Sequence, residues 1–588
     1  MPSMTLRISG RCGEGVILAG EILTLSAARS GLEVFAIKDY PAEMKGGLCT
    51  FQLRLGDQPL LSQGDRLDLL MAFNEQAFLE HVGDLRQDGL LVHDGDTFLP
   101  QGDDHARSFG LGLTTIAQKE INFLPGRNIL AVGILGGLLS LEPEKMESAL
   151  RQALRHKAPE VVNKNLQALS IGYLKGQELG AEARLPVFQR RPHLDRLVLN
   201  GNQAIALGAI AAGCRFYSGY PITPATEIME RLAEDLPKVG GDMVQTEDEI
   251  AALAMALGAS FAGKKAMTAT SGPGLSLMTE LLGLASMAEI PVVIVDVQRA
   301  GPSTGLPTKT EQSDLNHLLY GGHGEAPRIV IAPTTVEEAF YQTVRAFNLA
   351  EKYQMPVYLV SDQHLSQRIQ TITQPDLSRL SVVDRERATE AEGKYQRYEL
   401  TSSGISAMSI PGSNQHGIYV ATGLEHDLSG HPNYEPEMHR AMTAKRFRKL
   451  DQASREMAEA RTYGPQRAEV GVIGWGSTEG AVREAADRAG SEGIAVAVLY
   501  PTGLNPLPEH AIEEFASRVG KILVPEVNYS GQFAGFLRAR MGIDAYRLNK
   551  AGGAPFTPME IYLKIKEVAA DEQPQHRRKE PTVLQRRA

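Results

Sequence analysis

Cysteine is scarce in this chain, and its scarcity excludes several kinds of site. The 588 residues include three cysteines, Cys12, Cys49 and Cys214, which lie far apart in the sequence. No C-x-x-C spacing typical of a metal site occurs among them. We therefore expect no disulfide framework. An iron–sulfur cluster held by four thiolates cannot be built from this chain alone.

Long apolar runs and basic stripes are lacking too. No apolar run approaches the roughly 20 residues of a membrane span, and the N-terminus lacks the basic and apolar segments of a signal peptide. The formal net charge is −10, and only residues 571–588 are strongly basic. These features argue against nucleic-acid and membrane proteins and favour a cytoplasmic location. We expect the basic tail to be disordered because it has little apolar content.

What the chain does contain is an alternation of strand and helix patterns. In the first part, residues 4–10, 34–37, 68–73 and 89–93 read as strands, and residues 16–28 as a helix. A second group of strands is predicted at residues 265–269, 291–297, 328–331 and 356–360. Such alternation is typical of α/β proteins with βαβ units and a largely parallel sheet.

Composition divides the chain into successive parts. We predict a Rossmann-like domain, a linker, a second α/β domain, an irregular region with a helix at residues 437–461, a third α/β domain and the basic tail. Their boundaries are 1–180, 181–197, 198–375, 376–466, 467–570 and 571–588.

Glycine-rich turns after strands suggest nucleotide sites, but their spacing disfavours them. Residues 10–15 are followed by Asp39, as in a dinucleotide site, yet Leu18 stands where G-x-G-x-x-G needs its third glycine. A nicotinamide dehydrogenase is therefore a weak alternative. The backbone amides of this loop could still hold an anion at a helix N-terminus.

Thr223 lies between Pro221 and Pro224, and a residue before proline favours extended backbone angles. Pro224 suits the first position of a helix. The pattern therefore predicts Thr223 as the N-cap residue of a helix, with a rigidly held hydroxyl.

Glu249 ends the run Thr246-Glu-Asp-Glu249, which fits an S/T-x-x-E capping box. The following residues 250–260 are apolar nearly all round, which predicts a buried helix. Burial opposes the charge of an acid at such a helix start, whereas the helix dipole favours it. Which effect prevails stays open, but the carboxyl could form one strong hydrogen bond in a dry site.

Two cations follow the predicted strand 291–297. Arg299 stands at the strand end, where α/β sheets bind ligands, and a guanidinium matches a carboxylate bidentately. A solvated surface arginine is the alternative. Lys309 would supply a second cation in the same loop.

Together these motifs resemble the α subunit of the 2-oxoacid:ferredoxin oxidoreductases, thiamine-diphosphate enzymes that cleave 2-oxoacids with CoA. The resemblance rests on residues 220–224, 245–249, 270–274 and 298–314. It extends to a γ domain at Lys45-Gly-Gly47 and residues 128–133, and to a transketolase C-terminal-like domain at residues 474–477, 501–506 and 526–531.

The resemblance implies a role for each candidate residue. Glu249 matches the acid that bonds the aminopyrimidine ring of the cofactor. Thr223 matches the hydroxyl that contacts the 2-oxoacid, and Arg299 the cation that binds its carboxylate. Lys309 is the candidate for a second substrate carboxylate. The implied cofactor-binding residues are Tyr220, Pro221, Ile222 and Glu249.

The resemblance also implies a partner. The chain has no Gly-Asp-Gly loop of the kind that places Mg²⁺ and the diphosphate. Mg²⁺, the diphosphate and a [4Fe–4S] cluster are therefore expected in a β subunit, in an α2β2 assembly that passes electrons to ferredoxin. The fused γ domain is most like that of the 2-oxoglutarate enzymes, with pyruvate and branched-chain 2-oxoacids as alternatives. A non-catalytic subunit that binds CoA or thiamine is the alternative from another class.

Overall fold

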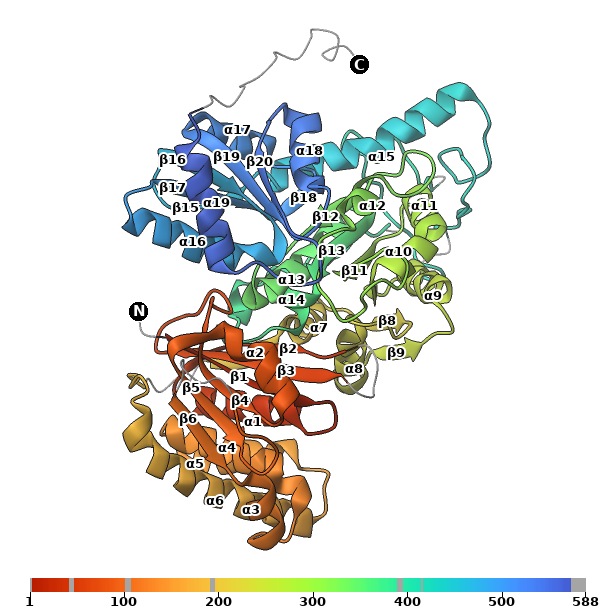
Figure 1. Cartoon of the computed structure of the whole chain (residues 1–588). Coiled ribbons are helices and arrows are strands. Elements are labelled where there is room, and N and C mark those ends of the chain that lie inside the picture. Colours follow the sequence, from red (N-terminus) through yellow and green to blue (C-terminus); the bar gives the residue numbers. More distant parts are fainter. Residues whose placement is uncertain are drawn as a thin grey trace. The chain divides into compact units, whose positions relative to one another are not determined.

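The computed structural model describes residues 3–41, 47–100, 107–190, 196–388, 395–413 and 416–572. The chain divides into two compact units, residues 1–199 with 367–374 and residues 200–366 with 375–588. Their helices and strands are labelled in Figure 1. Lys45 of the Lys-Gly-Gly motif and the predicted basic tail from residue 573 onward lie outside the described residues.

The first unit contains an eight-stranded mixed sheet in the order β6-β5-β4-β1-β3-β2-β14-β7. Its strands are β1 Ser3–Arg11, β2 Glu33–Asp39, β3 Leu48–Gly56, β4 Leu67–Ala72, β5 Leu85–Asp94, β6 Arg107–Leu111, β7 Arg196–Asn200 and β14 Ile369–Thr373. The run from β1 through β4 and β5 to β6 is parallel, as predicted. β3, however, runs antiparallel to both β1 and β2. The connection from β2 to β3 is shorter than the roughly dozen residues of a parallel crossover, so the prediction of a largely parallel sheet is wrong here.

Six helices accompany this sheet among the described residues. They are α1 Val16–Arg29, α2 Glu75–His81, α3 Leu113–Lys119, α4 Arg127–Leu138, α5 Pro143–Ala153 and α6 Pro159–Ala183. α4 and α6 approach each other closely through glycines. A Cβ on Gly133 would lie 2.3 Å from the carbonyl oxygen of Leu169, and one on Gly172 would lie 2.2 Å from that of Leu130. Only residues without side chains allow this backbone contact.

The glycine loop between β1 and α1 is tied down by its own side chains. Glu14 Oε1 forms an ion pair with Arg127 Nη2 at 2.7 Å. Cys12 and Cys49 form a disulfide between the loop and β3. The sequence led us to expect no disulfide framework, and this one disulfide was not foreseen. The two sulfurs meet because β1 and β3 are adjacent, with Gly10 opposite Cys49 in the register.

The second unit contains a seven-stranded sheet in the order β18-β12-β13-β11-β10-β8-β9. Its strands are β8 Phe216–Gly219, β9 Asp242–Gln245, β10 Ala266–Thr270, β11 Val292–Gln298, β12 Ile329–Ile331, β13 Pro356–Asp362 and β18 Gly503–Asn505. All its neighbouring strands are parallel except β12 and β18. Every residue of β11 is buried, which fits a parallel strand covered on both faces.

Eight helices belong to this sheet and its loops among the described residues. They are α7 Gly201–Ala211, α8 Thr226–Asp235, α9 Glu249–Phe261, α10 Gly272–Leu277, α11 Thr279–Met287, α12 Leu315–Tyr320, α13 Val336–Tyr353 and α14 Gln363–Gln367. α13 packs against α7 and the central strands, so the sheet is enclosed by helices as in other doubly wound folds.

A five-stranded sheet completes the second unit, in the order β15-β17-β16-β19-β20. Its elements are β15 Ala460–Tyr463, β16 Ala468–Ile473, α16 Glu479–Ser491, β17 Val496–Pro501, α17 Glu509–Ser517, β19 Val519–Glu526, α18 Gln532–Met541, β20 Tyr546–Asn549 and α19 Pro558–Ala570. α16 and α19 cover one face (Figure 1). On the other face, Leu499 and Phe515 join one buried cluster with Leu315 and Val330 of the seven-stranded domain. The two sheets therefore share a hydrophobic core.

Residues 376–466 connect these two sheets and contain α15, Pro436–Glu456. The helix predicted to end at residue 461 stops earlier because residues 460–463 form β15. On α15, Lys445 places Nζ 2.7 Å from both carboxylate oxygens of buried Glu289. Burial alone would raise the pKa of Glu289, but the charges of Lys449 and Lys445 outweigh it and lower the pKa to about 2. A buried ion cluster thus anchors the connecting region.

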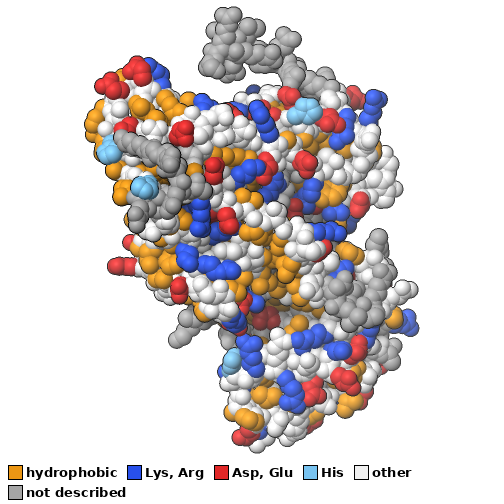
Figure 2. Space-filling model, turned by 180° about the vertical axis from the view of Figure 1, so that it is seen from behind, with side chains coloured by type: hydrophobic (Ala, Val, Ile, Leu, Met, Phe, Trp, Pro, Cys, Tyr) orange, Lys and Arg blue, Asp and Glu red, His pale blue; other side chains and the backbone are white. Residues whose placement is uncertain are grey.

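The surface carries charges of both signs. On the face drawn in Figure 2, basic side chains are interspersed with acidic and apolar ones. Among the described helices, none combines the length and the apolar composition needed to cross a membrane.

Candidate active site

The loops at one edge of the seven-stranded sheet carry the predicted site residues. Thr223 follows β8, Glu249 follows β9, and Arg299 follows β11. The loop after β10 adds Gly272 and Gly274. Because β8, β9, β10 and β11 are parallel, their carboxyl ends meet at the edge where α/β sheets bind ligands.

Thr223 lies in an irregular turn before α8 and does not cap that helix. α8 begins at Thr226, with Ala225 at the N-cap position. The amides of Ala225 and Thr226 donate to the carbonyl oxygen of Ile222 at 2.8 and 3.1 Å. Those amides are therefore already paired, and the predicted N-cap is wrong. The preceding Tyr220 is 40% exposed, and its side chain reaches the surface beside the site.

The start of α9 also differs from the prediction. Its N-cap is Asp248, whose carboxylate accepts a hydrogen bond from the amide of Ala251 at 2.7 Å. The hydroxyl of Thr246 instead donates to the carbonyl oxygen of Asp248 at 2.9 Å. The predicted capping box is thus wrong, because the side chain of Asp248 performs the capping. Glu249 is 5% exposed, and within the described chain no hydrogen bond reaches its carboxylate.

Gly274 allows Glu249 to approach the loop after β10. A Cβ at position 274 would lie 2.1 Å from Thr270 Oγ1 and 2.5 Å from Glu249 Oε1. Both distances are far below van der Waals contact, so a side chain at position 274 would displace one of these groups. The Glu249 carboxylate therefore lies against the first turn of α10.

Arg299 is buried and is not the solvated surface group of the alternative interpretation. Its side chain is 7% exposed, and Nη1 donates to the carbonyl oxygen of Thr223 at 2.7 Å. Nε has no partner among the described residues. Burial lowers the pKa of Arg299, whereas the charges of Asp314 and Glu249 raise it. The guanidinium therefore lies in the field of two carboxylates, next to Thr223.

Lys309 belongs to the loop between β11 and α12. The ends of this loop meet, since the amide of Ala300 donates to the carbonyl oxygen of Lys309 at 2.9 Å. The stem of Lys309 packs on Gly553, where an added Cβ would lie 2.4 Å from Lys309 Cβ. Gly553 follows β20, so the five-stranded domain lies behind Lys309. The Gly552-Gly553 pair was the sequence signal for this contact, and the motif analysis missed it.

Gln312 links the loop of Lys309 to two motifs of the third domain. Gln312 Nε2 donates to the carbonyl oxygen of Trp475 at 3.0 Å, and Asn528 Nδ2 donates to that of Gln312 at 2.9 Å. Segments 474–477 and 526–531 therefore hold the loop that carries Lys309.

Two aspartates at the same edge, Asp296 and the half-buried Asp314, were not singled out in the sequence. Asp296 lies within β11 and is fully buried, and neither of its carboxylate oxygens has a partner among the described residues. The carboxylate of Asp314 lies against Gly272, where an added Cβ would be 2.8 Å from Oδ2. The signal for Asp296 was a lone acid inside an apolar strand.

α9 is not buried all round, as its apolar sequence had predicted. Ala252, Leu253 and Ala256 pack into the core. On the opposite face, Ile250 is 47% exposed and Met255 is 40% exposed. The prediction of a buried helix is therefore correct for one face of α9 and wrong for the other.

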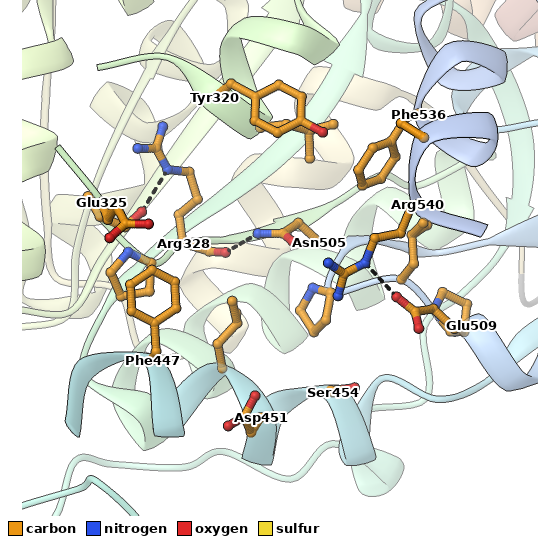
Figure 3. A pocket seen from close by; sticks show the side chains of 18 of the residues that line it. Tyr320, Glu325, Arg328, Phe447, Asp451, Ser454, Asn505, Glu509, Phe536 and Arg540 are labelled. Atoms are coloured by element: carbon orange, nitrogen blue, oxygen red, sulfur yellow. Dashed lines mark hydrogen bonds and ion pairs between the residues drawn. The ribbon is translucent and has the colours of Figure 1, made fainter. Parts of the chain in front are cut away.

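A cavity of about 910 Å³ lies apart from these residues, between α12, α15 and α18. Figure 3 shows its lining. Two of its three arginines are engaged: Arg328 Nη1 donates to the carbonyl oxygen of Gly321 at 2.6 Å, and Arg540 Nε lies 2.7 Å from Glu509 Oε1. None of the predicted site residues lines the cavity. We therefore place the candidate active site at the sheet edge, where Thr223, Glu249 and Arg299 meet.

Family models match most of the chain. The thiamine diP-binding model of pyruvate flavodoxin/ferredoxin oxidoreductase matches residues 207–445, which include Thr223, Glu249 and Arg299. The pyruvate ferredoxin/flavodoxin oxidoreductase model matches residues 5–174, and core domain II of pyruvate:ferredoxin oxidoreductase matches residues 468–561. The chain belongs to the 2-oxoacid:ferredoxin oxidoreductase family.

Its relatives include subunits named for 2-oxoglutarate. The 2-oxoglutarate oxidoreductase subunit KorA of Mycobacterium tuberculosis is 32% identical, over 95% of this chain and 91% of the relative. The 2-oxoglutarate synthase subunit KorA of Methanothermobacter marburgensis is 40% identical, over 62% of this chain and 97% of the relative. A solved structure of 2-oxoglutarate:ferredoxin oxidoreductase from Magnetococcus marinus, with 2-oxoglutarate, coenzyme A and succinyl-CoA bound, is 40% identical. Its TM-score is 0.92, and it covers 97% of this chain and 100% of its own. These matches confirm the predicted family and its α/β fold.

The residues at the sheet edge fit the pyrimidine half of thiamine diphosphate. Glu249 offers a nearly buried carboxylate to which no described residue donates a hydrogen bond. Glycine at position 274 leaves room for this carboxylate, because a side chain there would displace it. An acid held in this way can form a strong hydrogen bond to a ring nitrogen in a dry site.

Proposed function

We propose that this chain is the α subunit of a CoA-dependent 2-oxoglutarate:ferredoxin oxidoreductase, which converts 2-oxoglutarate reversibly to succinyl-CoA and CO₂. The observation that carries the proposal is the contact of buried Arg299 with Thr223 beside the acid Glu249. The names of the relatives and the ligands of the Magnetococcus marinus structure support 2-oxoglutarate. Pyruvate and branched-chain 2-oxoacids are the alternative substrates.

Glu249 is proposed to hydrogen-bond the aminopyrimidine ring of thiamine diphosphate. Its low exposure supports this role, because hydrogen bonds to a charged group strengthen when water is excluded. Tyr220, Pro221 and Ile222 are proposed to line the same pocket. The bound cofactor supplies the electron sink for decarboxylation, and the protein orients it.

Arg299 is proposed to bind the carboxylate next to the keto group, using donors that Thr223 does not occupy. Its Nε, which has no partner among the described residues, supports this role. The Thr223 hydroxyl is proposed to contact the same substrate. Lys309 is proposed to bind the second carboxylate of 2-oxoglutarate, a group that pyruvate lacks. Its loop is held from behind by Gly553, which favours a fixed position.

A β subunit is proposed to hold Mg²⁺, the diphosphate and a [4Fe–4S] cluster, and to pass electrons to ferredoxin. Two of the three cysteines are paired with each other, which supports a cluster on another chain. The exposed apolar face of α9 begins next to Glu249, at Ile250, and supports a partner that covers this side of the site. We propose an α2β2 assembly in the cytoplasm.

The parts of the chain are proposed to have the boundaries predicted from the sequence and the domain types that the resemblance implies. They are a γ domain over residues 1–180, a linker to 197, the pyrimidine-binding domain to 375, a connecting region to 466, a transketolase C-terminal-like domain to 570 and a tail.

The test is CoA-dependent ferredoxin reduction by the chain alone and with its β partner, across a panel of 2-oxoacids. We expect activity only from the pair, with 2-oxoglutarate as the best substrate. Lys309→Met should reduce kcat/KM for 2-oxoglutarate but not for pyruvate. Activity of the chain alone with thiamine diphosphate and Mg²⁺ would refute the division of labour, and a preference for pyruvate would refute the substrate. A pair that binds CoA but reduces no ferredoxin would favour the non-catalytic alternative.

A further inference from the structure

Two consecutive carbonyl groups in the turn before α8 accept hydrogen bonds from buried side chains. The carbonyl oxygen of Thr223 accepts from Arg299 Nη1 at 2.7 Å. The next one, that of Pro224, accepts from Asn202 Nδ2 at 2.8 Å. The two donors come from different elements, since Asn202 lies in the first turn of α7 and Arg299 follows β11. The backbone beside the Thr223 hydroxyl is therefore held by two independent side chains.

Asn202 is fully buried and uses the donor end of its amide. Nδ2 is the end that faces Pro224, because a carbonyl oxygen can only accept a hydrogen bond. Oδ1 is buried as well, and it has no partner among the described residues. A buried acceptor without a partner lowers stability, so this half of the amide gives no advantage. The hydrogen bonds of Nδ2 therefore account for an amide side chain at position 202.

The helix start that carries Asn202 is itself fixed. Asn200 is the N-cap residue of α7, and its Oδ1 accepts a hydrogen bond from the amide of Gln203 at 2.8 Å. A Cβ on Gly201 would lie 2.4 Å from the carbonyl oxygen of Leu365, so glycine is needed for this close approach of α7 to α14. Asn202 thus extends from a rigid support toward Pro224.

Glu227, in the first turn of α8, separates the roles of the two asparagines. Asn200 Nδ2 donates to Glu227 Oε2 at 2.8 Å, and Asn202 Nδ2 lies 3.4 Å from the same oxygen. Both asparagines therefore connect α7 to α8. Asn202 also binds the backbone beside Thr223, whereas the side-chain bonds of Asn200 in the described part of the chain end at Gln203 and Glu227. Asn200 is thus a matched control for Asn202.

We propose that Asn202 is a positioning residue for the 2-oxoacid. By holding the carbonyl group of Pro224, it keeps the Thr223 hydroxyl at a fixed distance from the guanidinium of Arg299. The inference deepens the proposed function and rests on it for the roles of Thr223 and Arg299. Those two residues contact the keto-acid end that all 2-oxoacids share, so the loss of Asn202 should weaken the binding of every 2-oxoacid alike.

Steady-state kinetics of the αβ complex test this role. Asn202→Ala should raise the KM for 2-oxoglutarate and for pyruvate by the same factor, about tenfold, with a smaller change in kcat. Asn202→Leu should do the same, because it nearly keeps the volume and removes the donor; it also takes the place of Asn202→Ala if the alanine variant does not fold. Asn200→Ala should lose stability with its helix cap but keep both KM values.

Three kinetic results would overturn the positioning role. They are an unchanged KM in both Asn202 variants, a rise confined to 2-oxoglutarate, and an equal rise in Asn200→Ala. The second would place the effect at the distal carboxylate and not at the turn. The third would show that Asn202 only supports the packing of α7 on α8.

Amide hydrogen exchange tests the turn without any turnover. The amides of Ala225 and Thr226 donate to the carbonyl oxygen of Ile222 within this turn. In the αβ complex, Asn202→Leu should speed their exchange about tenfold, whereas Asn200→Ala should speed exchange at Gln203 instead. Unchanged exchange at residues 225 and 226 would overturn the inference. If the complex is inactive with every 2-oxoacid, the proposed function fails, and the exchange rates still decide whether Asn202 holds the turn.

Discussion

Gly274→Ala is the sharpest test of the position of Glu249. The new Cβ would lie 2.5 Å from Glu249 Oε1 and 2.1 Å from Thr270 Oγ1. Ordinary contact begins near 3.4 Å, so the carboxylate would have to move by about 0.9 Å. Thr270 belongs to β10, where every residue is buried, and it has little freedom to move instead. Thr270 therefore stays in place, and the new Cβ should displace both the first turn of α10 and Glu249.

A misplacement of about 1 Å at a reacting group can cost roughly 10²-fold in rate, or about 2.7 kcal/mol of barrier. We therefore expect Gly274→Ala to lower kcat by about 10²-fold. The KM for 2-oxoglutarate should change little, because Arg299 and Thr223 are untouched. The assays are CoA-dependent ferredoxin reduction by the αβ complex and the exchange rate of the C2 proton of bound thiamine diphosphate. Overpacking should also lower the free energy of unfolding by about 1–3 kcal/mol.

Gly283→Ala is the matched control. Gly283 lies in α11, and a Cβ there would meet no atom within 4 Å. This variant should keep full activity and gain up to about 1 kcal/mol of stability, because alanine favours a helix more than glycine does. If Gly274→Ala retained kcat and the C2 exchange rate within a factor of three, the placement of Glu249 would not limit the reaction and the reasoning would be refuted.

Three further substitutions probe other parts of the second unit. Glu249→Gln should slow C2 proton exchange and kcat by about 10² to 10³ with the assembly intact on size exclusion; undiminished exchange would exclude its role. Arg299→Lys replaces the planar guanidinium by a compact ammonium charge and should raise the KM for 2-oxoglutarate about tenfold. A roughly tenfold loss in kcat with an unchanged KM would contradict a role of Arg299 in carboxylate binding. Glu289→Gln leaves Lys445 and Lys449 buried without their counter-charge, so urea unfolding at pH 7 should show a loss of about 3–5 kcal/mol. Because the folded-state pKa of Glu289 is depressed to about 2, this contribution is present above pH 4.5 and should disappear as the pH falls toward 2; a difference independent of pH would contradict the charge argument.

The parallel strands and the gathering of the site were predictable from the sequence. β10, β11 and β13 are compact apolar runs, and a parallel strand buried on both faces needs such a run. Once the strands are parallel, residues that follow them share one edge. Thr223 and Arg299, 76 residues apart, are therefore neighbours in the fold.

Features decided by the exact geometry of a turn or by tertiary contacts were not predictable in this way. Thr223 has the local sequence pattern of an N-cap residue. The amides of Ala225 and Thr226, however, donate to the carbonyl oxygen of Ile222 and not to the Thr223 side chain. The Cys12–Cys49 disulfide depends on an antiparallel register that neither cysteine reveals in the sequence. The outer face of α9 is as apolar as its inner face, so periodicity could not distinguish a core contact from an exposed surface.

The hydrophobic core that the two sheets of the second unit share has a consequence for how this part of the chain unfolds. Leu499 and Phe515 lie in one cluster with Leu315 and Val330, and all four are fully buried. Each such side chain contributes about 1.5–3 kcal/mol, and a folded domain is stable by only about 5–15 kcal/mol. A chain cut near residue 466 would lose enough of these contacts to unfold the domain that carries Glu249. The boundary at that residue thus separates two sheets that unfold as one cooperative unit. Heat or a protease should therefore destroy the thiamine site and the C-terminal sheet in a single step.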